Sequence, residues 1–221
     1  LFNIGHATFA AELGNDIWAP VPPSSYHVLQ GAQIIVNLSA DREILMREQY
    51  RSDLLKGHSA KTLCGYVYAS AGFGESTQDN VYAGAASIWE NGYKLAENER
   101  FQTASSMILA DIDVERLDGL RRKSAAFRNL SADRTYETIN AGDPCRTDFE
   151  KALYRHVEPH PFAPEADLDK RCREILEIQS TGLAKRLSHI GCRTAVLGIS
   201  GGLDSTLALL VAALAFEKLG W

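Results

Sequence analysis

One hexapeptide of this 221-residue chain has the residue types needed to bind phosphate: Ser200-Gly201-Gly202-Leu203-Asp204-Ser205. It follows an apolar run and precedes an apolar helical stretch, which is the arrangement that directs free backbone N–H groups at an anion. Paired glycines let the backbone approach a phosphate without a Cβ clash. No lysine precedes Ser205, so the loop is not of the GxxxxGK[ST] type. We interpret the hexapeptide as a nucleotide-phosphate loop.

The side chains of this loop could add to the backbone amides. Ser200 and Ser205 offer hydroxyl donors, whereas Asp204 at a helix start favours the helix dipole and could orient the loop or hold a metal ion. The simpler alternative is a Gly-Gly turn with a capping serine, joining a buried strand to a buried helix.

The elements around the loop follow from apolar spacing and turn residues. Residues 168–190 predict a long amphipathic helix, with Asp167 as N-cap and Gly191 as C-cap. Residues 194–199 predict a short buried strand, and a helix follows the loop. Three prolines between 158 and 164 exclude a helix there and mark a regional boundary.

The first part of the chain alternates strand and helix patterns. We expect strands at 34–36 and 65–69, a helix over 47–64, and a hairpin at Asn91-Gly92. Residues 107–117 predict a further strand that leads into a helix. The pattern is α/β with a mixed sheet.

Composition narrows the class of function. The net charge of −5 and pI of about 5.7 argue against general affinity for nucleic acid or anionic membranes. The four cysteines form no CxxC pair or zinc-spaced cluster, as in a reduced, cytoplasmic protein. Apolar runs are too short for a membrane span, which needs about 20 residues.

The order of several motifs resembles the glutamine-dependent NAD⁺ synthetases, in which a nitrilase-like glutaminase region precedes an ATP-using region with an SGGxDS loop. The segments that carry this resemblance are residues 9–25, 37–40, 49–51, 66–69, 74–77, 90–101, 174–187 and 195–211. It implies an α/β fold: the second half of a nitrilase-like αββα sandwich, then the first helix-strand-loop-helix of an adenine-nucleotide α-hydrolase-like, Rossmann-like domain. The regions expected are 1–115 for the glutaminase half, 116–164 for an extended linker and 165–221 for the start of the synthetase domain.

The resemblance also implies chemistry. Family members adenylate deamido-NAD⁺ with ATP and Mg²⁺, then let ammonia taken from glutamine displace AMP. ATP would bind at residues 200–205, Asp204 is a candidate metal ligand, and homo-oligomers are expected. Because the chain begins without Met and stops directly after an apolar helix, we interpret it as an excerpt that has no synthetase turnover by itself.

The glutaminase half departs from the family at its nucleophile. The resemblance aligns Gly14 with the catalytic cysteine, and the Glu and Lys of the triad would lie before Leu1. Glycine has no atom that can attack an amide. Cys64, at a helix end, is expected to be a buried structural thiol, and the three histidines of this half (His6, His27 and His58) to be solvated or to lie at the edge of the core. We therefore expect no glutamine hydrolysis.

The residues that would hold glutamine are partly kept. The resemblance places contacts at Asp41, where a serine is usual, and at Arg47, whose alternative role is a solvent-facing helical arginine. Residues 75–77 (Glu-Ser-Thr) could form the pocket rim or a capped loop. Two rival functions stay open: a catalytically inactive nitrilase-like interaction module, and a plain amidase, which the missing cysteine disfavours.

Overall fold

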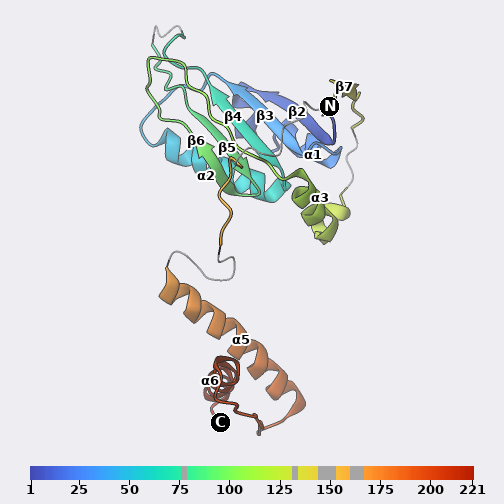
Figure 1. The fold of residues 1–221 in the computed structure, drawn as a ribbon, viewed down its shortest axis with the longest axis vertical. Helices are drawn as coiled ribbons and strands as arrows, with labels where there is room; N and C mark the ends of the chain where they lie inside the picture. The colour runs from blue at the N-terminus through green and yellow to red at the C-terminus, as the bar shows by residue number, and fades with distance from the viewer. Residues whose placement is uncertain (76–78, 131–133, 144–152, 160–166) are drawn as a thin grey trace. The chain divides into compact units, whose positions relative to one another are not determined.

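The computed structural model describes residues 1–75, 79–130, 134–143, 153–159 and 167–221. It divides into two compact units, Leu1–Val157 and Glu158–Trp221, each described by itself (Figure 1). Within the described residues, no helix is long and apolar enough to cross a membrane.

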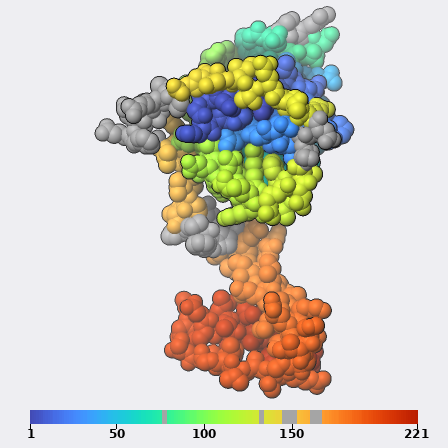
Figure 2. All heavy atoms as spheres, turned by 90° about the vertical axis from the view of Figure 1, so that its right-hand side faces the viewer, coloured from blue at the N-terminus to red at the C-terminus, as the bar shows by residue number. Residues whose placement is uncertain are grey.

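The first unit is built on a sheet of seven strands in the order β6-β5-β4-β3-β2-β1-β7. β2, β3 and β4 are mutually parallel, β1 is antiparallel to β2, and β5 and β6 continue the other side as antiparallel strands. Figure 2 shows residues 134–143 (yellow) beside the first strand (dark blue), where β7 pairs with β1. The strands are β1 (Phe2–Ile4), β2 (Ala7–Leu13), β3 (Ile34–Ser39), β4 (Gly65–Ser70), β5 (Ala86–Glu90), β6 (Tyr93–Glu97) and β7 (Ile139–Asn140).

The core lies on the sheet face that packs against helices α1 (Pro23–Leu29) and α2 (Arg47–Thr62). Side chains alternate between the faces of a strand, so the aligned residues of four neighbouring strands share this face. They are Ala10, Ile35, Tyr66 and Trp89, all at most 4% exposed.

Most predicted elements of this unit are confirmed. The strands at 34–36 and 65–69, the helix from 47, and the Asn91-Gly92 hairpin all form. The predicted strand from 107 is wrong: Met107 and Leu109 are 81% and 51% exposed, and no strand forms before helix α3 (Val114–Lys123). In the described part of the sheet β5 already pairs on both sides with β4 and β6, which leaves it no edge for a further strand.

The region 116–164, expected to be an extended linker, begins inside α3 and contains the short helix α4 (Ala125–Arg128) and β7. Leu117 is fully buried, and the Arg121 guanidinium donates to the carbonyl oxygens of Ala32 and Leu63 at 2.7 and 3.0 Å. The start of this region is thus packed onto the first unit.

The second unit consists of helices α5 (Leu168–Ile190) and α6 (Leu203–Lys218), which pack through Ala184, Leu187 and Ala215. Gly191 ends α5 with a φ of +67°, as predicted, but the Asp167 side chain makes no capping hydrogen bond. The predicted buried strand at 194–199 is wrong, since Val196 is 100% exposed. Among the described residues of this unit no other strand offers a ladder partner, so the apolar run stays irregular.

Candidate functional site

Gly14 lies where strand β2 ends and the 3-10 helix η1 (Gly14–Trp18) begins. Its φ of +54° is left-handed, and an added Cβ would meet no atom within 4 Å. The turn is fixed by Asp16, whose carboxylate accepts from the Leu13 amide at 2.8 Å. A side chain therefore fits at position 14 in space, at a backbone cost of roughly 1 kcal/mol.

A cavity of about 330 Å³ opens next to this turn. It brings together Asp41 and Arg47, the two residues predicted to contact glutamine, with Asn15, the neighbour of Gly14. Its lining consists of Asn15, Ala40, Asp41, Arg42, Ile44, Arg47, Asn80 and Tyr82. Glu75 is exposed and does not line this cavity, while Ser76 and Thr77 lie outside the described residues.

Asp41 and Arg47 form a bidentate ion pair, with Nη2 to Oδ1 at 2.9 Å and Nε to Oδ2 at 3.1 Å. The Asp41 side chain is 3% exposed and that of Arg47 is 23% exposed. The guanidinium carbon of Arg47 also lies 3.5 Å from the centroid of the Trp18 ring. Arg47 is therefore not the solvent-facing helical arginine of the alternative interpretation.

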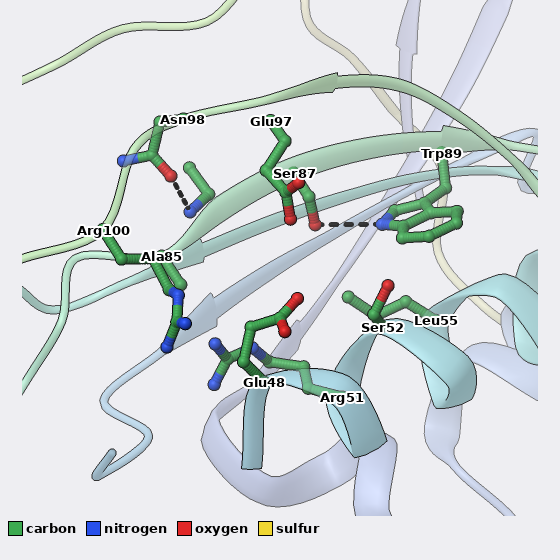
Figure 3. Close-up of a pocket in the computed structure, with 11 residues that line it drawn as sticks. Glu48, Arg51, Ser52, Leu55, Ala85, Ser87, Trp89, Glu97, Asn98 and Arg100 are labelled. Carbon is green, nitrogen blue, oxygen red and sulfur yellow. Dashed lines mark hydrogen bonds between the residues drawn. The ribbon is translucent and has the colours of Figure 1, made fainter. Parts of the chain in front are cut away.

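Behind this pair, Arg51 extends the charge network. It contacts Asp41 at 3.4 Å and Glu43 at 3.3 Å, and Glu43 also contacts Arg100 at 3.2 Å. Figure 3 shows Arg51 projecting from α2 into the space below β5, with Arg100 nearby. Three arginines share two carboxylates, so no buried carboxylate of this network is left without a cation. Arg51 follows Arg47 by one helical turn, a spacing by which the sequence could have found it.

A second buried network lies behind the Gly14 turn, on the core side of the sheet. Glu12, which is 2% exposed, accepts from the Ser24 amide at 2.9 Å and from the Tyr66 hydroxyl. The Ser24 hydroxyl contacts His58 Nε2 at 2.8 Å. His58 is thus buried at 7% exposure rather than solvated, whereas His6 is exposed and His27 half-buried.

Burial controls the titration of this network. It raises the pKa of Tyr66, and the negative charge of Glu12 raises it further. The pKa of His58 is lowered by burial, against an opposing effect of Glu12. Burial also raises the pKa of the Cys64 thiol to about 11, which agrees with a structural thiol and not a nucleophile.

The loop at 200–205 is exposed and leads directly into the 16-residue helix α6. Gly202 is the N-cap residue and supplies no capping side chain, so the helix start keeps unpaired N–H groups. Gly201 has a φ of +83°, which favours glycine. The Ser205 hydroxyl donates to the Gly202 carbonyl at 3.1 Å and lies 3.2 Å from the Ser200 hydroxyl.

No protein-family model matches the chain. Comparison with curated proteins gives 39% identity over 218 residues, 95% of this chain, to the glutamine-dependent NAD(+) synthetase of Mycobacterium tuberculosis. The chain is homologous to glutamine-dependent NAD(+) synthetases. The protein of the same name from Thermotoga maritima is 28% identical over 98% of the chain. The chain spans about a third of these relatives, 32% and 35% of their lengths.

Two solved structures of glutamine-dependent NAD(+) synthetases also match. The enzyme from Cytophaga hutchinsonii is 28% identical with a TM-score of 0.38, and the match covers 44% of this chain and 15% of that one. The enzyme from Acinetobacter baumannii in complex with ADP is 18% identical with a TM-score of 0.45, covering 94% of this chain and 31% of that one.

Asp204 is the residue of this chain that was predicted as a candidate metal ligand. In the part of the chain that is described, no three His, Cys, Asp or Glu side chains gather as a metal site. A Mg²⁺ ion bound through substrate phosphates needs only one or two protein carboxylates. The exposed Asp204, in the first turn of α6, is compatible with that arrangement.

Proposed function

We propose that the protein to which this chain belongs is an ATP-dependent NAD synthetase that amidates deamido-NAD⁺. The observation that carries the proposal is the 39% identity to glutamine-dependent NAD(+) synthetases over 95% of the chain. The chain also has a glycine loop in front of a helix that lacks a capping side chain, which supports phosphate binding.

In the proposed reaction, an oxygen of the nicotinate carboxylate attacks the α-phosphorus of ATP, and pyrophosphate leaves. Ammonia then attacks the activated carbonyl carbon, AMP departs, and a proton is lost to solvent. The amides near Gly201, Gly202 and Ser205 would hold the phosphates, and Mg²⁺ beside Asp204 would offset their charge.

The relatives are named for their dependence on glutamine, but the proposed nitrogen source of this protein is different. Gly14 supplies no nucleophile, so a thioester with glutamine cannot form at that position. We therefore propose that free ammonia is the nitrogen donor of this protein. The nitrilase-like half would then shape and shield the enzyme without hydrolysing glutamine.

The test is NAD⁺ formation by the full-length parent from ATP and deamido-NAD⁺, with either ammonia or glutamine. We expect turnover with ammonia and none with glutamine. Turnover with glutamine at a comparable rate would contradict the assignment of Gly14, and no turnover with either donor would contradict the synthetase assignment.

Gly14 also favours one rival function, a catalytically inactive nitrilase-like interaction module. That rival predicts stable self-association of the full-length protein and no protection of residues 200–205 by ATP. Hydrogen exchange of the loop amides with and without ATP separates the two functions, because the synthetase predicts protection.

A further inference from the structure

The cavity beside Gly14 contains two guanidinium groups, and they differ in what they already bind. Arg42 is exposed and has no hydrogen-bond or ion-pair partner among the described residues. Arg47 donates from both Nε and Nη2 to the Asp41 carboxylate, at 3.1 and 2.9 Å. Such a two-bond fork is how arginine recognises the carboxylate of a small ligand. In this chain the Asp41 carboxylate occupies the fork.

Several contacts hold Asp41 in this position. Its second cation, Arg51, lies 3.4 Å from Oδ2, so both carboxylate oxygens are in use. Its backbone amide donates to the Ser70 hydroxyl at 3.1 Å. The flat face of the Arg47 guanidinium rests on Trp18. To bind in the Arg47 fork, a ligand carboxylate would have to displace the buried Asp41 carboxylate, which has two cationic partners.

We propose that Asp41 is a built-in carboxylate that closes the glutamine site by filling the guanidinium fork of Arg47. The proposal rests on the proposed function, because it treats this cavity as the family's glutamine site. A ligand carboxylate entering beside Asp41 would meet a like charge in a poorly solvated place, which opposes binding. Two residues would then prevent the use of glutamine. Gly14 supplies no nucleophile to attack the amide, and Asp41 blocks binding of the glutamine carboxylate.

The geometry indicates which variant reopens the site. Asp41→Ser removes the carboxylate and frees the Arg47 fork, while Arg51 keeps Glu43 as a partner at 3.3 Å. Asp41→Asn removes the charge with almost no change of shape, and serves if the serine variant does not fold. Asp41→Ser/Arg47→Met removes the fork as well, and is the matched control.

The experiment is calorimetric titration of the full-length parent and these variants with glutamine, and with glutaminol, which lacks the carboxylate. Circular dichroism melting verifies that each variant is folded. We expect the wild-type protein to bind glutamine at least about ten-fold more weakly than Asp41→Ser, so that only the variant saturates over the glutamine concentrations used. The gain should vanish in Asp41→Ser/Arg47→Met and be absent for glutaminol.

Glutamine binding by the wild-type protein as tight as that of Asp41→Ser would overturn the proposal. So would folded Asp41→Ser and Asp41→Asn proteins that both fail to bind. Ammonia-dependent NAD⁺ formation by the wild-type protein reports on the proposed function without glutamine, so the two proposals fail independently.

Discussion

The hydroxyl of Tyr66 donates a hydrogen bond to the buried carboxylate of Glu12, two residues before the Gly14 turn. Together with the Ser24 amide, this bond fixes the end of β2 to β4 and to the start of α1. On the core side of the sheet, the Glu12 carboxylate and its two hydrogen-bond donors therefore fix the position of the turn beside the cavity.

Glu12→Gln should lower the free energy of unfolding by about 1–3 kcal/mol, because a neutral amide replaces a buried carboxylate that has two donors. Urea denaturation followed by circular dichroism measures it. Glu99→Gln, at an exposed position with no partner among the described residues, is the matched control and should change stability by less than about 0.5 kcal/mol. Equal effects of the two changes would show that the hydrogen bonds of Glu12 do not contribute to the free energy of unfolding.

His58 should make stability depend on pH. Its pKa is lowered by burial in the folded state, so the unfolded chain takes up the proton first. Stability is then full above the ordinary pKa of 6.5 and falls as the pH drops through 6.5 towards the lower folded value. Urea denaturation at several pH values should show a smaller loss in His58→Gln than in the wild-type protein. His27, whose pKa is also lowered by burial, accounts for part of the remaining loss.

The cysteines should react in an order set by burial. Cys64 is fully buried with its pKa raised to about 11, while Cys172 is exposed on α5. Brief alkylation at pH 8 followed by peptide mass spectrometry should label Cys172 and leave Cys64 unlabelled until urea is added. Labelling of Cys64 at the rate of Cys172 in the folded protein would contradict the burial and the structural role of this thiol.

Gly201→Ala should weaken ATP binding by the full-length parent by about ten-fold or more, since its φ of +83° strains any residue with a Cβ. Equilibrium binding of a fluorescent ATP analogue measures the change. Gly182→Ala is the matched control, because Gly182 lies within α5 and an added Cβ meets nothing within 4 Å. Unchanged affinity in Gly201→Ala would remove this loop from the ATP site.

Short sequence patterns correctly predicted the elements that depend mainly on residues close together in the chain. The β-branched run at 34–36 and the Asn91-Gly92 turn specify their strands by themselves, and Gly191 specifies a helix end. The run at 194–199 has the same apolar character, yet it remains exposed because a strand needs a neighbour, which is a non-local condition.

In the candidate site, individual residues could be predicted from the sequence, but the contacts between them could not. Asp41 and Arg47 could be singled out by their position in the family pattern, but not their ion pair, which depends on how the loop after β3 folds back onto α2. The Glu12–Tyr66 bond joins residues 54 positions apart, and no periodicity or spacing indicates it. Contacts of this kind join residues that are far apart in the chain, so they become visible only in the tertiary structure.

The most direct test of the synthetase assignment is exchange of labelled pyrophosphate into ATP, catalysed by the full-length parent without ammonia. Adenylation of deamido-NAD⁺ is reversible at that stage, so we predict exchange that appears only when deamido-NAD⁺ is present. Absence of exchange, or exchange that does not depend on deamido-NAD⁺, would contradict it.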